Sequence, residues 1–284
     1  MGRESPLADV ERLCLESFVR HVECFERLGS TNNRAAELAG RRELPTPALV
    51  AARLQTAGRG RGSHTWWADD GALTFSLLLD TAAQGFTPRD WPRLSLTTAV
   101  AVCDAIQAEC MEQEAGNSES IPALTSLPPA PCSIKWPNDV LIDGGKVCGI
   151  LVESPGGPAP AKDRLIVGVG INVNNSWRSA PPEAGPSGTA LCDITGRQHD
   201  LQKVLLGVLR ALDHRLDQLA SGNPQLSQVW QLLNLLIEQD VLVEMNGKRF
   251  EGRCVGIAVD GALVVETPRG AHRYYSGTVR SVNN

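Results

Sequence analysis

The stretch 54-LQTAGRGRGSHTWW-67 decides how the rest of the chain is interpreted, because it places a charged loop with three glycines between two β-rich runs. The run PALVAARLQ (47–55) leads into the loop and ALTFSLLLD (72–80) follows it, and both compositions favour strands. Glycine loses more backbone entropy on ordering than any other residue, so a loop this rich in glycine usually has a functional reason. Arginine carries a planar fork of donors that suits carboxylates and phosphates. The stretch therefore predicts an anion-binding loop around Arg59 and Arg61.

Composition excludes several classes of protein. The chain has 284 residues, 42% of them hydrophobic, which is enough for a sizeable core and more than one domain. Asp and Glu number 32 against 27 Lys and Arg, so the net charge is −5, whereas a dedicated nucleic-acid binder usually has a basic excess. No apolar run reaches the roughly 18 residues of a membrane span, and segment 1–18 lacks the apolar region of a signal peptide. We therefore expect a cytoplasmic protein that binds neither DNA nor a membrane.

The eight cysteines are scattered singly along the chain. No Cys-x-x-Cys pair occurs, and no histidine stands at zinc-site spacing from a cysteine. Cys148, within the apolar run KVCGILVE (146–153), is typical of a small buried core residue. We expect reduced structural thiols and no metal site.

Hydrophobic periodicity indicates both strands and helices, which is the pattern of an α+β fold. Strand-like runs lie at 21–30, 47–55, 72–80, 133–143, 146–154 and 163–175, and helical patterns at 31–40, 91–110 and 200–220. In the first helix, Asn32 or Asn33 is available as the N-cap and Gly40 as the stop signal. Segment 114–132 is rich in proline and serine, which predicts a surface insertion between a helix and a strand.

The chain changes character near residue 236. From about residue 239 onward, short strand-like runs are separated by the turns Asn-Gly-Lys, Asp-Gly and Arg-Gly, which is the chemistry of β-hairpins. Several such hairpins predict a small β-barrel. The sequence thus predicts an α+β domain over residues 1–236 and an all-β domain over 237–284.

Familiar catalytic and phosphate-binding motifs are absent from the sequence. It contains no GxxxxGK[ST] loop, and GVGINV (168–173) lacks the third glycine of a dinucleotide fingerprint. No GxSxG elbow occurs, and the five histidines are scattered without a Ser-His-Asp arrangement. Fixed cations without an evident nucleophile indicate catalysis by positioning and charge neutralisation.

Three further stretches suit such chemistry. GSTNN (29–33) groups small polar side chains at a strand-to-helix turn, KWPNDV (135–140) places a lysine at a strand end, and VGVGINVNN (167–175) ends an apolar strand in asparagines. Each also has an ordinary structural explanation, namely a helix cap, a solvated surface lysine and a turn. Their occurrence together with the arginine loop favours a ligand site.

In this combination and order, the motifs resemble those of the biotin protein ligases. The shared stretches are STN (30–32), QTAGRGRG with a following Trp (55–66), KWPNDV (135–140), KVCGILVE (146–153) and GVGINVN (168–174). They span residues 21–177, and GRGR…W together with KWPND is a highly specific pair. The resemblance implies a mixed-sheet catalytic domain of the biotin/lipoate ligase type, followed by an SH3-like C-terminal barrel. It also implies the short form of the enzyme, without an N-terminal DNA-binding domain.

The same resemblance implies a two-step reaction. Biotin and ATP, the latter with Mg²⁺, form biotinyl-5′-AMP, and a lysine of a biotin carboxyl carrier protein then takes the biotinyl group. The implied catalytic residues are Lys135 at the acyl–phosphate junction and Arg59 and Arg61, which neutralise the two anions. The implied biotin site comprises Ser30, Thr31, Asn32, Gln55, Gly58, Arg59, Gly60, Arg61 and Lys135, and the implied ATP site comprises Arg61, Trp66 and Asn172.

The chain departs from the family pattern at two points. Some members have a further arginine before the tryptophan, whereas this chain has GSHT (62–65), with His64 nearest to that position. Trp67 doubles the aromatic at Trp66, so the ring that stacks on the nucleotide is ambiguous, although the register favours Trp66.

Alternative functions come from other classes of protein. A lipoate or octanoate ligase would share the fold, but its RRxSGGG-type loop is missing here. A nucleic-acid or adaptor protein would use GRGRG as an RGG-like segment, which leaves KWPNDV (135–140) unexplained. A ligase–repressor needs an N-terminal winged helix, and only 29 residues precede Ser30, about half of such a domain. The choice between a monomer and a homodimer stays open.

Overall fold

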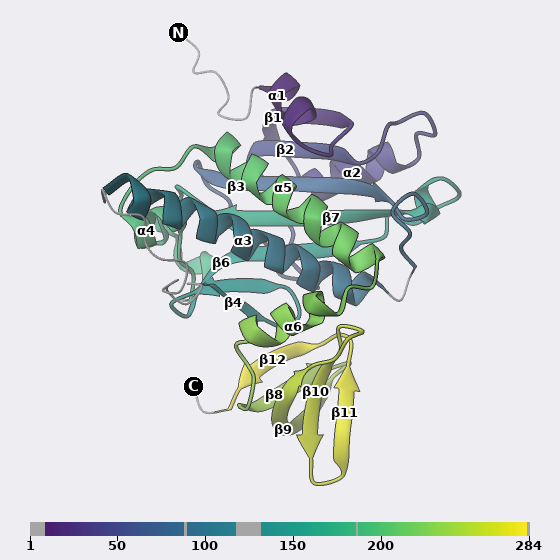
Figure 1. The fold of residues 1–284 in the computed structure, drawn as a ribbon, viewed down its shortest axis with the longest axis vertical. Helices are drawn as coiled ribbons and strands as arrows, with labels where there is room; N and C mark the ends of the chain where they lie inside the picture. The colour runs from purple at the N-terminus through teal and green to yellow at the C-terminus, as the bar shows by residue number, and fades with distance from the viewer. Residues whose placement is uncertain (1–8, 88–89, 118–131, 186, 283–284) are drawn as a thin grey trace.

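The structure is a computed structural model that describes residues 9–87, 90–117, 132–185 and 187–282. Figure 1 shows a larger domain built on one sheet, with a small all-β domain beside it and helix α6 between the two. Most of the insertion predicted at 114–132 lies outside the described residues.

A mixed sheet of seven strands forms the centre of the larger domain, in the order β1-β2-β3-β7-β6-β5-β4. Along the chain the strands are β1 (His21–Leu28), β2 (Ala48–Gln55), β3 (Ala72–Asp80), β4 (Cys132–Lys135), β5 (Asp139–Ile142), β6 (Gly145–Glu153) and β7 (Arg164–Asn172). Only β1 and β2 pair in parallel, because a helix connects them, and the other neighbouring strands pair antiparallel. The predicted mixed-sheet fold is confirmed.

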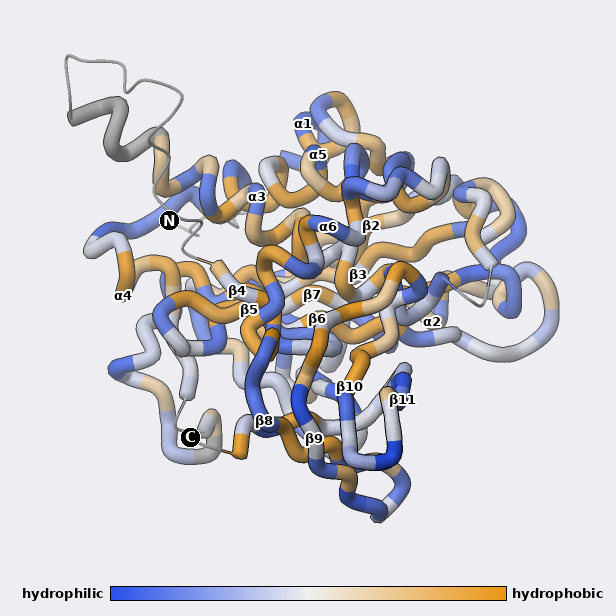
Figure 2. Tube along the Cα trace, turned by 60° about the horizontal axis from the view of Figure 1, so that its bottom comes forward, coloured by the Kyte–Doolittle hydropathy of each residue, from blue (hydrophilic) through white to orange (hydrophobic). Residues whose placement is uncertain are grey.

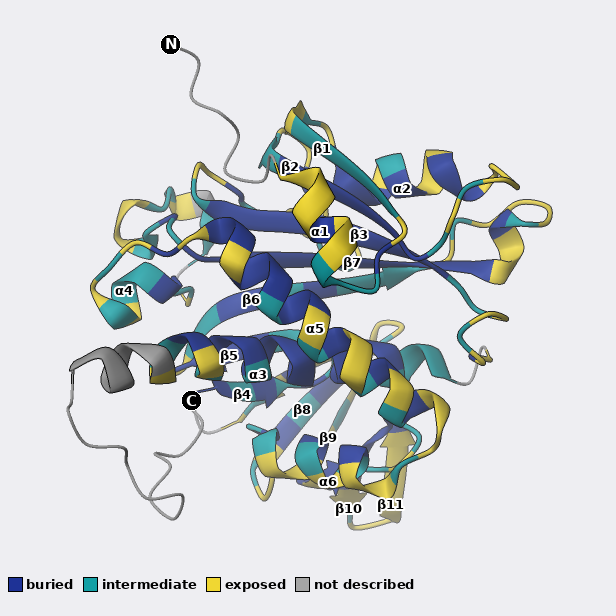
Figure 3. Ribbon diagram, turned by 45° about the horizontal axis from the view of Figure 1, so that its top comes forward, coloured by how far each residue is buried: buried dark blue, intermediate teal, exposed yellow. Residues whose placement is uncertain are grey.

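Helices cover both faces of this sheet, and strand alternation separates two cores. In β2, Leu49 and Ala51 face one core, whereas Ala48 and Val50 face the other. The larger core lies under α3 (Trp91–Asn117) and α5 (Leu201–Ala220), which pack against each other across one face of the sheet (Figures 1 and 3). The smaller core lies under α2 (Thr31–Ala39) on the opposite face. The other α-helices among the described residues of this domain are α1 (Val10–Glu16), α4 (Leu191–Thr195) and α6 (Pro224–Leu233).

Two details of the helices differ from the sequence prediction. The N-cap of α2 is Ser30, in extended backbone conformation, so Asn32 and Asn33 lie inside the helix, while Gly40 ends it as predicted. Within α3, the segment Trp91–Met111 is long enough and apolar enough for a membrane span, at a mean hydropathy of 1.2. The sequence analysis had expected no segment of that length and hydropathy. Of that window, 72% is buried inside the fold, so core packing accounts for its hydropathy.

The C-terminal domain is an antiparallel sheet of five strands in the order β11-β10-β9-β8-β12. The strands are β8 (Asp240–Met245), β9 (Lys248–Ile257), β10 (Leu263–Thr267), β11 (Gly270–Tyr274) and β12 (Thr278–Ser281). Asn246 and Gly247 both have positive φ, 52° and 73°, which is the conformation that a tight hairpin turn requires. The predicted hairpins are therefore confirmed, and Figure 2 shows hydrophilic and hydrophobic segments mixed along these strands.

The two domains contact each other through side-chain hydrogen bonds. The indole nitrogen of Trp136, after strand β4, donates a hydrogen bond of 3.0 Å to the carbonyl of Gly261 in the C-terminal domain. Gln231 of α6 exchanges hydrogen bonds of 2.8 and 3.1 Å with the backbone of Ile257. These contacts hold the small sheet beside the strands that carry KWPNDV.

Candidate active site

A cavity that is partly open to solvent lies on the α2 face of the sheet. It is lined by Ser30, Thr31, Asn32, Gln55, Arg59, Gly60, Arg61, Trp66, Phe75, Asn138, Lys146, Gly149, Ile150, Leu151, Gly168, Val169 and Gly170. Segments far apart in the sequence, namely the start of α2, the arginine loop and strands β6 and β7, thus meet at one place. Of the predicted site residues, Gly58, Lys135 and Asn172 are the ones that do not line this cavity.

The start of α2 is tied to the end of β2 by hydrogen bonds. The backbone N–H of Thr31 donates to Oε1 of Gln55 at 2.8 Å, and the Thr31 hydroxyl donates to the same oxygen at 3.2 Å. Ser76, buried on β3, has its hydroxyl 2.7 Å from the Thr31 hydroxyl and 2.6 Å from Oδ1 of Asn32. Ser76 was missed by the sequence analysis, and it fixes both polar residues of the helix start.

Glycines in the sheet make room for the side chains that line the cavity. Gly168 of β7 lies opposite Ser76 in the β3–β7 register, and a Cβ atom there would overlap the amide of Asn32. A Cβ atom at Gly170 would overlap the indole of Trp66. The GVG sequence of β7 therefore supplies the floor on which Asn32 and Trp66 rest, rather than a phosphate loop.

The arginine loop is a short hairpin. Its arms are joined by the hydrogen bond from the N–H of Trp66 to the carbonyl of Gly58, 3.0 Å, and by that from Gly60 to His64, 2.7 Å. Gly58 lies so close to the opposite arm that a Cβ atom there would stand 2.7 Å from the carbonyl oxygen of Trp66. The glycines thus permit a tight hairpin that presents Arg59 to the cavity.

Three cations line the cavity, and each has a protein partner. Arg59 forms a bidentate ion pair with the carboxylate of Glu153, at 2.9 and 2.5 Å. Arg61 donates to the carbonyl of Gly277 in the C-terminal domain at 2.6 Å, and burial lowers the pKa of its guanidinium. Lys146 forms an ion pair of 2.6 Å with Asp139. The positive charge of the cavity is therefore held in place by other groups of the protein.

The lysine of the cavity is Lys146 and not Lys135. Lys135 ends β4, which is the edge strand of the sheet, whereas the cavity floor is formed by β7 and β6 near its centre. Lys146 stands on β6 itself, with its ammonium 5.6 Å from the ring centroid of Trp66. Position in the sheet, which the sequence alone does not show, separates the two lysines.

The doubled tryptophan has two different environments. Trp66 lines the cavity, and its indole Nε1 is buried without a hydrogen-bond partner among the described residues. Trp67 packs edge-on against Trp177, with ring centroids 5.3 Å apart and an interplanar angle of 83°. The cavity ring is Trp66, as the register favoured.

Asn172 does not line the cavity, but it bonds to the backbone of a residue that does. The Asn172 amide is buried and donates to the carbonyls of Lys146, at 3.3 Å, and Thr189, at 3.0 Å. The N–H of Lys146 in turn donates to the carbonyl of Ser187 at 2.8 Å. Asn172 therefore holds the main chain that carries Lys146.

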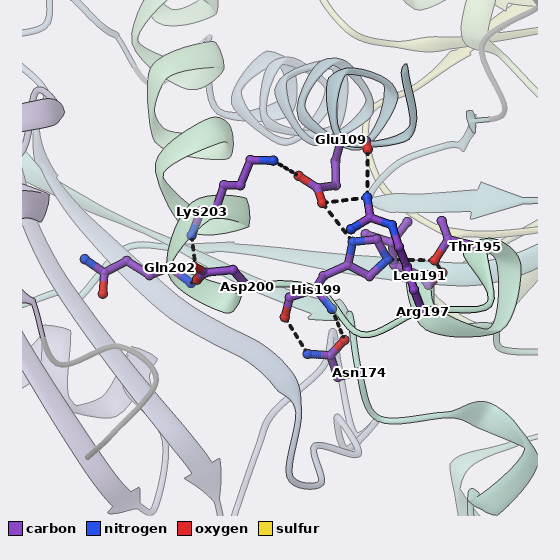
Figure 4. Close-up of polar contacts among 9 residues, drawn as sticks. All are labelled: Glu109, Asn174, Leu191, Thr195, Arg197, His199, Asp200, Gln202 and Lys203. Carbon is purple, nitrogen blue, oxygen red and sulfur yellow. Dashed lines mark hydrogen bonds and ion pairs between the residues drawn. The ribbon is translucent and has the colours of Figure 1, made fainter. Parts of the chain in front are cut away.

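A second polar cluster lies outside the cavity, beside the end of β7 (Figure 4). The carboxylate of Glu109, on α3, is 3.0 Å from Arg197, 2.9 Å from Nδ1 of His199 and 3.1 Å from Lys203. The backbone N–H of His199 donates to the side-chain carbonyl of Asn174 at 2.9 Å, and its carbonyl accepts from the same amide at 2.8 Å. The cluster fastens α3 to the segment before α5.

Comparisons with known proteins agree with the motifs. The profile of the biotin/lipoate A/B protein ligase family matches residues 24–172, and that of the biotin protein ligase C-terminal domain matches residues 236–279. The chain is 31% identical to the bifunctional ligase/repressor BirA of Bacillus spizizenii, over 92% of this chain and 74% of that protein. It is 33% identical to the biotin–[acetyl-CoA-carboxylase] ligase of Mycobacterium tuberculosis, over 85% of this chain and 80% of that protein. The structure of the biotin protein ligase from Aquifex aeolicus in complex with biotin and ATP is similar to it with a TM-score of 0.71 at 27% identity, covering 92% of this chain and 99% of that one.

Proposed function

Because this chain belongs to the biotin/lipoate A/B protein ligase family and is a biotin protein ligase, we propose that its cavity is the place where biotin and ATP react. The carboxylate of biotin attacks the α-phosphorus of ATP, which releases pyrophosphate and leaves biotinyl-5′-AMP. The amine of a lysine on a biotin carboxyl carrier protein then attacks the acyl carbon, and AMP leaves.

The observation that carries this proposal is that one cavity combines uncharged polar groups with fixed cations. Biotin has the matching chemistry, since its ureido ring is uncharged and its side chain ends in a carboxylate. Thr31 occupies Oε1 of Gln55, which leaves the Gln55 amide N–H groups for the ureido carbonyl. The side chain of Ser30 makes no capping bond to α2, so its hydroxyl is available to the ring.

In this proposal Lys146, and not Lys135, is the lysine at the acyl–phosphate junction. The resemblance to the biotin protein ligases had given that role to Lys135. Negative charge builds on the oxygens between the carboxylate and the α-phosphate, and an ammonium beside them offsets it. In the second step, the attacking amine creates an oxyanion at the same acyl carbon, so the same cation serves again. The support for this assignment is the place of Lys146 in the cavity lining, opposite Trp66.

The arginine hairpin neutralises the two anions that must meet. Arg59 and Arg61 approach the carboxylate and the α-phosphate. The buried Nε1 of Trp66 is a donor without a partner among the described residues, which suits an acceptor on the nucleotide. Asn172 acts on the nucleotide side indirectly, through the main chain of Lys146 and Thr189.

Mg²⁺ enters this reaction with ATP rather than as a resident ion. No group of three metal-ligating side chains is found among the residues that the structure describes. Mg²⁺ that accompanies ATP is held mainly by phosphate oxygens and water. When bound, Mg²⁺ withdraws charge from the phosphates and so assists the departure of pyrophosphate.

The carrier protein meets the cavity from its open side, and the C-terminal domain contributes to the closed site through the contact of Gly277 with Arg61. We place the reaction in the cytoplasm, where ATP is available and where buried thiols such as Cys103, Cys148 and Cys254 stay reduced. The predicted domain limits, 1–236 and 237–284, belong to the same proposal.

Biotin-dependent exchange of radioactive pyrophosphate into ATP tests the first step directly. We expect exchange with biotin and background rates with lipoate or octanoate, because those acids lack the ureido group that Gln55 and Ser30 would bind. Transfer to a purified biotin carboxyl carrier domain tests the second step. Exchange that depends on lipoate instead of biotin would contradict the proposal.

A further inference from the structure

Glu153, the last residue of β6, contacts two residues of the cavity without lining it. Its carboxylate receives both Nη groups of Arg59, and its Oε2 accepts a hydrogen bond of 2.7 Å from the amide nitrogen of Asn32. One carboxylate thus joins the arginine hairpin to the start of α2. Both segments are distant from Glu153 in the sequence, by 121 and 94 residues.

The contact with Glu153 determines the orientation of the Asn32 amide. Asn32 donates through Nδ2 to Glu153, and Ser76 donates to its Oδ1 at 2.6 Å. The amide lies over Gly168, where it is 5% exposed, so its two ends have different, fixed partners. A buried amide with both ends bonded presents one donor and acceptor pattern to a ligand.

The same contact restrains Arg59 without using all of its donors. A guanidinium has five N–H groups in a fixed fork, and the bidentate pair uses one from each Nη. The remaining N–H groups stay available to the cavity that Arg59 lines. Since an unrestrained arginine loses much side-chain entropy on binding, a fork that is already held loses less.

We infer that Glu153 is a positioning residue of the biotin site, which sets both the Arg59 fork and the Asn32 amide before biotin binds. The inference rests on the proposed function. Glu153 is a carboxylate at a site that binds anions. Charge repulsion alone would make a carboxylate unfavourable there. The benefit of holding Arg59 and Asn32 therefore outweighs the repulsion between Glu153 and the carboxylate of biotin.

The test compares Glu153→Gln with Glu23→Gln in the full chain. Glu23 on β1 forms a similar bidentate pair with Arg34 of α2, at 2.8 and 3.1 Å, and neither residue lines the cavity. We expect Glu153→Gln to raise the KM for biotin in pyrophosphate exchange about tenfold, with kcat changed less than about threefold, as for loss of a charge-assisted contact. Glu23→Gln should leave the KM for biotin unchanged. It should alter the midpoint of thermal unfolding by about as much as Glu153→Gln does.

Two further measurements separate positioning from general structural damage. Quenching of tryptophan fluorescence during biotin titration reports binding independently of turnover, because Trp66 lies in the cavity. Glu153→Asp keeps the charge that holds Arg59, so its KM should fall between those of wild type and Glu153→Gln. A KM for Glu153→Gln that equals the Glu23→Gln value, or lies below wild type, would overturn the inference. Absence of biotin-dependent exchange in wild type would instead contradict the proposed function.

Discussion

The ammonium nitrogen of Lys146 lies 2.6 Å from Oδ1 of Asp139. The two residues belong to neighbouring antiparallel strands, β6 and β5, and the ammonium also lies 5.6 Å from the ring centroid of Trp66. Both side chains are partly exposed, 35% for Lys146 and 25% for Asp139, so a ligand anion can reach the ammonium without opening a fully buried ion pair. Asp139 therefore holds the lysine over the cavity floor.

We expect Lys146→Gln to slow adenylate formation about 10²–10³-fold, the usual loss when one preorganised donor to a developing charge is removed. Glutamine keeps much of the volume and removes the charge. Lys135→Gln is the matched control, because Lys135 ends the edge strand β4 and does not line the cavity, and its rates should stay within about threefold of wild type. Single-turnover rates of adenylate formation, and of transfer from preformed adenylate, measure both steps. Equal losses in the two variants would show that the lysine is misassigned.

Gly168→Ala should damage the cavity and the fold together. The new methyl would overlap the Asn32 amide, so we expect a higher KM for biotin and a loss of about 1–3 kcal/mol in the free energy of unfolding. Gly207→Ala, within α5, is the control, because its methyl would meet only the Cβ of Ala105 at 3.7 Å. That variant should be as stable as wild type or up to about 1 kcal/mol more stable. Biotin binding and stability at wild-type levels in Gly168→Ala would show that Asn32 can move away freely.

Local patterns were sufficient to predict most of the fold from the sequence. Strand alternation and helical periodicity depend on neighbouring residues, so the core helix at 91–110 and the strands around the arginine loop were found. The Asn246–Gly247 turn was equally readable, because a tight hairpin requires positive φ at both positions. The continuation of α3 beyond residue 110 was not predicted, although no proline or glycine stop stands at residue 110.

The site residues that the sequence did not predict reach the cavity through contacts between segments that are distant in the sequence. Lys135 and Lys146 both stand in strand-like runs, and the strand order β7-β6-β5-β4 alone brings Lys146 to the cavity. Ser76 carried a weak local signal, because Thr74 and Ser76 interrupt an apolar run at a spacing of two and so share one face of β3. Glu153 had no such signal, since its partners lie 94 and 121 residues away in the chain.

The cluster around Glu109 should make stability depend on pH. Burial raises the pKa of this carboxyl, but hydrogen bonds and charges from His199 and Lys203 outweigh burial, and the net pKa is below the ordinary value. A carboxyl with a lowered pKa in the folded state contributes stability above its unfolded pKa, about 4.3 for glutamate, and loses it as the pH falls through the folded pKa. Arg197 also faces this carboxylate, at 3.0 Å (Figure 4).

We therefore expect Glu109→Gln to be less stable than wild type at pH 7 and to approach wild type at pH values below about 4. Urea unfolding at a series of pH values measures the difference. Glu43→Gln, at an exposed loop position, is the control and should follow wild type at every pH. A stability difference between Glu109→Gln and wild type that does not change with pH would contradict the prediction.

The contact between Trp67 and Trp177 should couple the arginine hairpin to the segment that supports Lys146. Trp177 rests on Gly188, where a Cβ atom would overlap its indole, and Gly188 forms a β-bridge with Lys146. The N–H of Thr189 also donates to the carbonyl of Lys146, at 3.0 Å. A change at Trp67 can thus reach the backbone of Lys146 through Trp177 and Gly188.

Trp67→Ala should therefore weaken the nucleotide side of the site more than the biotin side. Edge-to-face aromatic pairs contribute about 0.5–1.5 kcal/mol, so we expect the KM for ATP to rise about three- to tenfold, while the KM for biotin changes little. Trp67→Phe keeps an aromatic edge against Trp177 and should retain most of the affinity. Hydrogen exchange of residues 187–189 should quicken in Trp67→Ala and not in Trp67→Phe, because those backbone bonds depend on Trp177 staying packed. If exchange there is unchanged while the KM for ATP rises, Trp67 contacts the nucleotide itself and the coupling does not exist.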